Sequence, residues 1–201
     1  LGKKSIALNL RSPGGMAVFH DLVRVADGVF NNLRGDLPAK LGVDYGALHP
    51  VNPSVVCCSL SGFGANGPMA SEPGYDYLVQ GYAGYMSITG EPDGPPGKSG
   101  VSVIDFAGGY AAMVGLLAGL LDAKNTGRGR DIDVSLLDTA VSMLSYFAAW
   151  SLNTEWEPAR TANSAHQTLV PSQNFQTSDA WIIVFCAKEK FYRNLVQILG
   201  A

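Results

Sequence analysis

The sequence predicts an α/β fold in which helices flank a parallel sheet, followed by the start of a smaller α+β domain. Two observations predict it. First, short apolar segments rich in β-branched residues alternate with segments of helical periodicity, a pattern typical of parallel strands joined by helical crossovers. Second, apolar residues make up 47% of the 201 residues and charged residues only 15%, enough to bury a sizeable core.

The expected elements follow one another in regular alternation. The strands are apolar segments between turn-forming residues, and they lie over 5–10, 29–32, 54–60, 100–104 and 131–134. The strand over 29–32 is expected to be short and buried. The helices have apolar residues at helical spacing, and they lie over 13–26, 37–41, 44–48, 76–86, 105–122 and 135–148. Such alternation predicts a Rossmann-like sheet with helices on its faces.

The chain is expected to comprise an incomplete large-domain core over 1–152. Residues 153–168 are polar and lack periodicity, so a linker is predicted there. A strand over 181–187 and a helix over 189–199 then open a small domain that starts at residue 169.

The composition argues against several classes of protein. A net charge of −3 lacks the basic excess of a nucleic-acid-binding surface. Cys57, Cys58 and Cys186 lie in apolar segments and are too few for a disulfide framework, so buried free thiols and a reducing, cytoplasmic compartment are expected. The uncharged run over 106–121 is shorter than the roughly 20 residues that cross a bilayer. We therefore expect a core helix in a soluble protein without a signal peptide.

A glycine motif, Gly62-x-Gly64-x-x-Gly67, matches the dinucleotide-binding fingerprint and follows a predicted strand. Pro68 and Pro73 interrupt the helix that would bind a pyrophosphate. We therefore interpret the motif as a tight loop near a ligand. The three histidines lack metal-ligand spacing and no serine-hydrolase motif occurs, so neither a metal site nor hydrolase chemistry is expected.

Asp105 is the most informative residue, because it lies between an apolar segment and a long uncharged helix. One interpretation is a helix N-cap. The other is a nucleophile, since helix-terminal N–H groups keep a carboxylate ionised and Gly108 and Gly109 leave room for a substrate. Asp76 has a similar position at the start of an earlier helix, and the sequence does not place it near Asp105.

Ordered segments along nearly the whole chain resemble class III CoA-transferases, the family that includes formyl-CoA:oxalate and carnitine CoA-transferases and α-methylacyl-CoA racemase. The segments are Lys4–Leu10, Asn32–Arg34, Asn52-Pro53, Ser59–Gly64, Gly67-Pro68, Pro73–Asp76, Gly90–Pro96, Asp105–Gly109, Thr126–Gly129 and Asp133–Asp138. Each segment alone is weak, but the ordered set is specific.

The resemblance implies that Asp105 attacks an acyl-CoA thioester, and that CoA then passes through an aspartyl-CoA thioester to a free carboxylic acid. CoA is thus expected as a substrate, with no permanently bound cofactor and small dicarboxylic acids as donors and acceptors. The residues that match CoA contacts of the family are Arg11, Asn32, Arg34, Lys40, Tyr75 and Asp76. Where family members often have Pro-Gly, this chain has Gly35-Asp36, which puts an acidic residue near the expected anion path.

Two alternatives remain. The racemase branch of the family has a histidine at the position of Tyr75, and a tyrosine hydroxyl is a poor acid–base group for α-proton exchange near neutral pH. This difference favours a transferase over a racemase. The resemblance also implies further segments before and after this chain and an interlocked homodimer. A chain truncated at both ends, possessing CoA binding without catalysis, is the second alternative.

Overall fold

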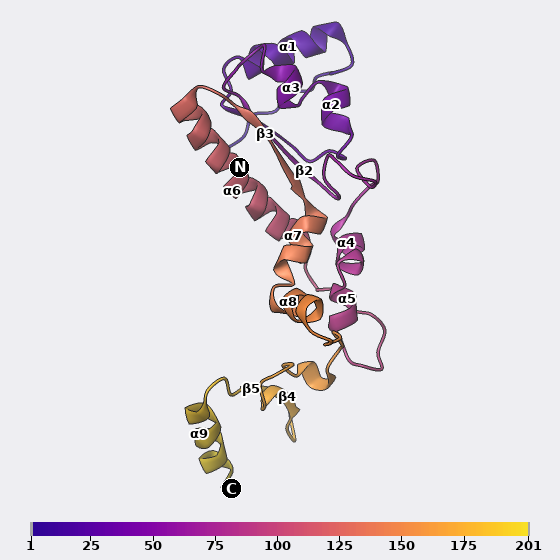
Figure 1. Ribbon diagram of the computed structural model, residues 1–201, viewed down its shortest axis with the longest axis vertical. Coiled ribbons are helices and arrows are strands. Elements are labelled where there is room, and N and C mark those ends of the chain that lie inside the picture. Colours follow the sequence, from indigo (N-terminus) through magenta and orange to yellow (C-terminus); the bar gives the residue numbers. More distant parts are fainter. Residues whose placement is uncertain (1, 201) are drawn as a thin grey trace. The chain divides into compact units, whose positions relative to one another are not determined.

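The computed structural model describes residues 2–200, which divide into two compact units (Figure 1). The first unit extends to Val79 and resumes over Val101–Met143. The second comprises Gln80–Gly100 and the residues from Leu144 onwards. The domain boundaries expected from the sequence remain a prediction.

The first unit is built on a three-stranded parallel sheet in the order β1–β2–β3. Its strands are β1 (Gly28–Asn31), β2 (Val56–Ser61) and β3 (Arg130–Ser135). Its helices are α1 (Pro13–Val23), α2 (Leu37–Leu41), α3 (Tyr45–Leu48), α6 (Val103–Thr126) and α7 (Leu136–Met143), and α4 (Asp76–Tyr82) begins in it. The central strand β2 is almost entirely buried because strands pair on both edges and helices cover both faces. The parallel α/β fold class is confirmed.

Adjacent cysteines on β2 face opposite sides of the sheet, as alternation along a strand requires. Cys57 packs with Val23 of α1, whereas the Cys58 thiol donates to the carbonyl oxygen of Ala112 on α6. Both thiols are free and buried, as predicted, and burial raises the pKa of Cys57 to about 12. Cys186 is also free but only partly buried, which corrects the expectation for that residue.

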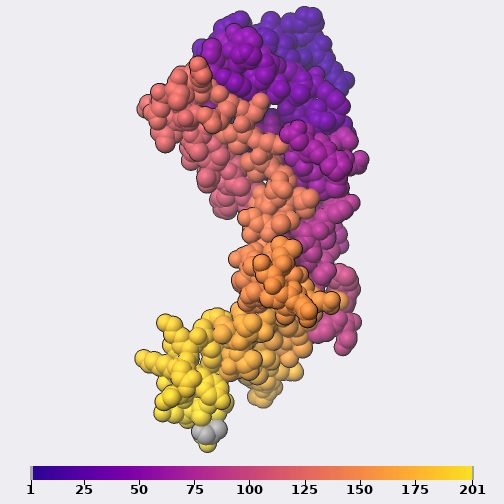
Figure 2. All heavy atoms as spheres, viewed as in Figure 1, coloured from indigo at the N-terminus to yellow at the C-terminus, as the bar shows by residue number. Residues whose placement is uncertain are grey.

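Helix α6 lies close against the sheet because glycines face it. A Cβ at Gly119 would lie 2.7 Å from Ile132 and 2.9 Å from Val56, and one at Gly115 would lie 2.9 Å from Ile132. Among the described residues, α6 is the one helix long and apolar enough to cross a membrane, with a mean hydropathy of 1.7. Small residues of α6 pack on the sheet, but only 22% of its apolar window is buried. Large apolar side chains of α6, among them Tyr110, Leu117 and Leu121, are exposed, and the helix forms part of the molecular surface in Figure 2.

The second unit is small and mixed. A two-stranded antiparallel sheet pairs β4 (Ser172–Gln176) with β5 (Trp181–Phe185). Its helical elements are α5 (Tyr85–Ile88), α8 (Tyr146–Asn153), the 3₁₀ turn η1 (Ala162–Ser164) and α9 (Glu189–Leu199). Aromatic rings hold α8 to the chain that follows it: Trp150 and Trp156 meet edge to face with ring centroids 5.4 Å apart.

Two expected strands are wrong. Residues 5–9 form no strand, and Ile6 is 61% exposed. The segment over 100–104 instead turns into α6, which begins at Val103. A strand requires a hydrogen-bonding neighbour, and the apolar composition of a segment does not supply one. The strand β1 was expected to be buried, but it lies at the edge of the sheet, and its Phe30 is 52% exposed.

Two expected helices are each broken by a residue with positive φ. The helix over 76–86 divides at Gly84, where φ is +88°. The helix over 135–148 begins as predicted, with the Asp138 N–H donating to Ser135 Oγ, but it divides at Ser145, where φ is +51°. The first helix ends at Val23, earlier than expected. The strand β4 was not predicted.

Candidate active site

The carboxyl ends of all three parallel strands open onto one cavity of about 530 Å³ in the first unit. Ligands of open α/β sheets bind at this edge. The residues that line it lie at the ends of the strands or just after them, in the loop before α4 and in the first turn of α6: Phe30, Asn32, Leu33, Arg34, Leu60, Ser61, Gly62, Pro73, Gly74, Tyr75, Asp105 and Leu136.

Glycines bring two of these segments into direct contact. A Cβ at Gly62 would lie 2.4 Å from the Cα of Gly74, so the loop before α4 reaches the end of β2 only because neither residue has a side chain. Gly64 follows in the left-handed region, with φ at +84°. In this structure Gly62 of the fingerprint-like motif serves a close backbone approach at the rim of the cavity.

Asp105 reaches the cavity from the first turn of α6. It is the third residue of the helix, so the N-cap expected for it is wrong. Ser102 holds the cap position without a side-chain hydrogen bond, and Asp76 supplies the acceptor. The Oδ2 atom of Asp76 accepts from the backbone N–H groups of Ile104 at 2.8 Å and Asp105 at 3.2 Å. The helix therefore starts earlier than a local cap at Asp105 would allow.

The Asp105 side chain is exposed to solvent, and among residues 2–200 no group donates a hydrogen bond to it. Partial burial raises the pKa of the Asp105 carboxyl above its ordinary value, and the negative charge of Asp76 raises it further. A carboxylate with a raised pKa is more basic, and unpaired it is free to react. The arrangement suits a nucleophile.

The two glycines after Asp105 have different roles. A Cβ at Gly109 would contact nothing within 4 Å, and Gly109 lines an open cleft that continues from Asp105 along α6. A Cβ at Gly108 would lie 2.6 Å from the side chain of Leu136. Only Gly109 therefore leaves room for a substrate, and Gly108 serves the packing of α6.

Arg34 lines the cavity and belongs to an ion-pair cluster. Its guanidinium donates to both carboxylate oxygens of Asp36, at 2.6 and 3.0 Å. Lys40 donates to Oδ2 of the same carboxylate at 2.5 Å. These bonds hold the pKa of Asp36 well below its usual range. Two cations thus share the carboxylate of Asp36, and the negative charge of Glu72 also acts on Arg34.

The structure brings together Asn32, Arg34, Tyr75 and Asp105 of the residues predicted from the sequence. Asn32 ties β1 to β2 by donating from Nδ2 to the carbonyl of Leu60 at 2.6 Å, and the Tyr75 side chain is exposed. The other three predicted residues, Arg11, Lys40 and Asp76, do not line the cavity.

Each of those three has a separate place. Lys40 is linked to Arg34 through Asp36, and Arg11 lies exposed before α1. Asp76, expected as a CoA contact, is buried, and its carboxylate is bonded to α6. The sequence analysis missed Leu33, Ser61 and Leu136, although their positions just after or at the ends of strands are the signal that marks such residues.

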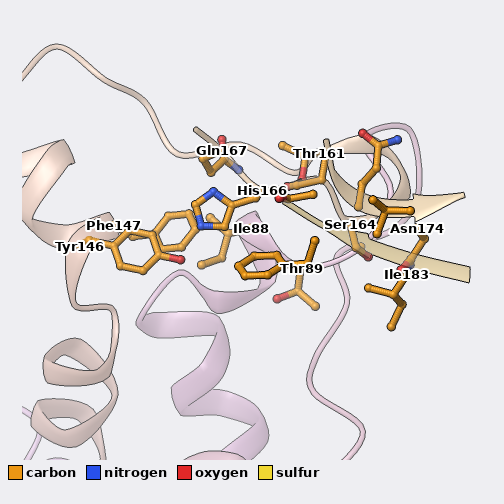
Figure 3. Close-up of a pocket in the computed structure, with 16 residues that line it drawn as sticks. Ile88, Thr89, Tyr146, Phe147, Thr161, Ser164, His166, Gln167, Asn174 and Ile183 are labelled. Carbon is orange, nitrogen blue, oxygen red and sulfur yellow. Dashed lines mark hydrogen bonds between the residues drawn. The ribbon is translucent and has the colours of Figure 1, made fainter. Parts of the chain in front are cut away.

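A second cavity, of about 390 Å³, lies in the second unit (Figure 3). Tyr146 and His166 lie at one part of its wall with their rings stacked at a centroid distance of 6.3 Å. The N–H of Thr168 donates to Nδ1 of His166. Among the described residues that line it there is no Asp, Glu, Lys or Arg. It therefore lacks a carboxylate nucleophile and a fixed positive charge, and the first cavity is the better candidate.

A known protein family matches the whole chain. The family model described as CoA-transferase family III matches residues 1–201. The chain belongs to this family. The resemblance found in the sequence is thereby confirmed.

The chain is also similar to named relatives and to a solved structure. The chain is 41% identical over 199 residues to succinate–glutarate CoA-transferase of Agrobacterium fabrum, covering 99% of this chain and 50% of the relative. It is 38% identical over 202 residues to acetyl-CoA:oxalate CoA-transferase of Acetobacter aceti, covering 100% and 51%. The crystal structure of a CAIB/BAIF family protein from Brucella suis superposes with a TM-score of 0.85 at 35% identity, covering 99% and 52%. The chain thus spans about half the length of these relatives.

Proposed function

We propose that this protein transfers coenzyme A from an acyl-CoA to a free carboxylic acid, with Asp105 as the nucleophile. The observation that carries the proposal is the Asp105 carboxylate itself. It is exposed, lacks a hydrogen-bond donor among the described residues, and lies at the cavity where the parallel strands end. Membership of CoA-transferase family III supports the reaction class.

The reaction proceeds through four acyl substitutions at Asp105. The carboxylate attacks the thioester carbonyl of the donor, the C–S bond breaks, and a mixed anhydride and CoA thiolate form. The thiolate attacks the aspartyl carbonyl, which gives an aspartyl-CoA thioester and releases the donor as its carboxylate. The acceptor carboxylate then attacks this thioester and expels the thiolate. Attack of the thiolate on the acceptor carbonyl forms the new acyl-CoA and restores Asp105.

The side chains around the cavity suit the charges of the substrate. CoA carries phosphate groups, and the guanidinium of Arg34, which also pairs with Asp36, lines the cavity. The open side at Gly109 leaves space for the acyl group beside Asp105. The relatives named for succinate, glutarate and oxalate support small dicarboxylic acids as donor and acceptor. A homodimer and a cytoplasmic location remain expectations from the sequence.

Tyr75 argues against the alternative of an acyl-CoA racemase. Among the described residues that line the cavity are one carboxylate, Asp105, and the exposed phenol of Tyr75, but no histidine. Proton exchange at the α carbon needs two opposed acid–base groups, and a tyrosine hydroxyl is a poor acid–base group for this reaction.

The experiment that tests the function distinguishes CoA transfer from proton exchange at the α carbon. The protein is incubated in D₂O with succinyl-CoA, with and without glutarate, and the CoA esters are resolved by mass spectrometry. We expect glutaryl-CoA only when glutarate is present, without deuterium at the α carbon of succinyl-CoA. Deuterium incorporation independent of glutarate would support the racemase. Binding of CoA with neither reaction would support the non-catalytic alternative.

A further inference from the structure

The carboxylate of Asp76 ties the start of α4 to the start of α6. Asp76 is the first residue of α4 and is only 6% exposed. Its Oδ2 atom accepts from two successive N–H groups in the first turn of α6, those of Ile104 and Asp105. Asp76 therefore performs, from 28 residues earlier in the chain, the function that an N-cap side chain usually performs locally.

This remote cap has a consequence for the residue that follows it. In a capping box, the acidic side chain at the third helical position bonds back to the helix start and is not free to react. Asp105 holds that third position in α6. Asp76 takes the place of the Ser102 side chain as acceptor for the N–H groups of Ile104 and Asp105, and the Asp105 side chain lies at the cavity.

We propose that Asp76 is a positioning residue for Asp105: by accepting from the backbone N–H groups of Ile104 and Asp105, it fixes the first turn of α6 and with it the place from which the Asp105 carboxylate attacks the substrate. This inference rests on the proposed function. The charge of Asp76 also acts on its neighbour, since it is the second cause, after burial, of the raised pKa of Asp105. Arg34 and Tyr75 are the other titratable groups that share the cavity with Asp105.

The test compares three variants of the full chain. Asp76→Ala removes the acceptor, and we expect kcat for CoA transfer to fall by about 100-fold, because misplacing a reacting group by about 1 Å has this effect. The KM for succinyl-CoA is expected to change less than about threefold, since Asp76 does not line the cavity. Asp76→Asn retains an oxygen acceptor for the two N–H groups, and we expect it to restore most of kcat.

The matched control is Asp44→Ala, which removes the cap of α3. The Oδ1 atom of Asp44 accepts from the Ala47 N–H at 3.2 Å, and Asp44 does not line the cavity. This variant is expected to lower the midpoint of thermal unfolding without changing kcat per folded molecule. The pH profile adds a further readout: removal of the negative charge in Asp76→Asn should move the acidic limb of kcat/KM to lower pH.

The outcomes separate this inference from the proposed function. If wild-type protein transfers CoA and Asp76→Ala loses kcat while Asp76→Asn and Asp44→Ala retain it, the positioning role is supported. If Asp76→Ala retains wild-type kcat, or loses activity only in proportion to its unfolded fraction as Asp44→Ala does, the inference is overturned. If the wild-type protein itself transfers no CoA, the proposed function fails first.

Discussion

Helices α1 and α6 begin in opposite ways. At α1, Ser12 caps the helix with its own side chain, which accepts from the Gly15 N–H at 3.1 Å, and Pro13 follows in the first turn. At α6, the residue in the cap position makes no side-chain bond, and the cap comes from Asp76 on another helix. One helix start is local in the sequence and the other depends on the tertiary fold.

The difference concerns which side chains remain available. A local cap uses a polar side chain at the helix start for stability alone. A remote cap satisfies the same N–H groups without a side-chain bond from the residue at the cap position. In α6, that first turn carries Asp105 at the edge of the cavity. The helix that is capped from a distance is thus the one that presents a reactive group.

Replacing Asp105 should have the largest effect on catalysis. We expect Asp105→Asn to lower kcat for CoA transfer by at least about 1,000-fold, because removal of a nucleophile eliminates the covalent route. The same variant should fold normally, since the Asp105 side chain takes no part in capping α6. Steady-state kinetics and thermal unfolding measure the two effects. A variant with lost activity and a collapsed first turn would show that Asp105 is a cap after all.

The same variant also has a predicted pH dependence of stability. The raised pKa of Asp105 means that the folded state binds its proton more tightly than the unfolded state, so ionisation of Asp105 lowers stability as the pH rises through the folded pKa. Asp105→Asn should therefore be at least as stable as wild type at pH 7. Below the ordinary aspartate pKa of 3.8, this advantage should disappear. Urea unfolding at both pH values would check the sign.

Gly109→Leu tests whether the open side of the α6 start is needed for the substrate. The leucine side chain would occupy the cleft beside Asp105, so we expect kcat/KM for succinyl-CoA to fall by about 100-fold, the effect of displacing a substrate by about 1 Å. Stability should be maintained, because no atom lies within 4 Å of the position that a Cβ would occupy. Unchanged kinetics would mean that the acyl group approaches Asp105 from another side.

Alanine at the two neighbouring glycines should shift stability in opposite directions. Gly109→Ala gains helix propensity of up to about 1 kcal/mol without a clash. Gly108→Ala gains the same propensity, but its Cβ would lie 2.6 Å from the Leu136 side chain and 3.3 Å from Leu60, at a cost of about 1–3 kcal/mol. Denaturant unfolding of the pair measures the difference. Equal stability would contradict the packing described for this turn.

Ser12→Ala should have the smallest effect and only on stability. Loss of the local cap is expected to lower the free energy of unfolding by about 1 kcal/mol. No change in kcat per folded molecule is expected, because this cap serves α1 alone. An unfolding curve and an activity assay on the same sample would check both. A loss of kcat comparable to that of Asp76→Ala would remove the contrast between the two helix starts.

The sequence predicted the helices and strands that neighbouring residues determine. Apolar residues at helical spacing over 13–26 and 135–148 predicted the starts of α1 and α7, and the apolar segment over 54–60 predicted β2. It failed where tertiary structure decides. Residues 5–9 have no strand partner in the part of the chain that the structure describes, and positive φ at Ser145 divides a continuous helical pattern.

The candidate site was also predicted where neighbouring residues determine it and missed where the tertiary fold determines it. Asp105 was recognised as a candidate nucleophile from its flanking residues and the family resemblance, but its exact place in α6 was not, because the capping residue lies far away in the sequence. Likewise, Gly62 was recognised as part of a tight loop, whereas its contact with Gly74 depends on how two segments meet. Arg34 and Lys40 were identified as candidate cations, but their shared bond to Asp36 was not foreseen.

The most direct test of the account is the mass of the intact protein after incubation with succinyl-CoA. Wild type should gain the mass of one CoA moiety, bound as an aspartyl thioester, and peptide mapping should locate it at Asp105. Hydroxylamine should remove the adduct, and Asp105→Asn should not form it. Two results would contradict the assignment of Asp105 as the nucleophile. One is an adduct at another residue. The other is an Asp105→Asn variant that forms the same adduct as a wild type that transfers CoA.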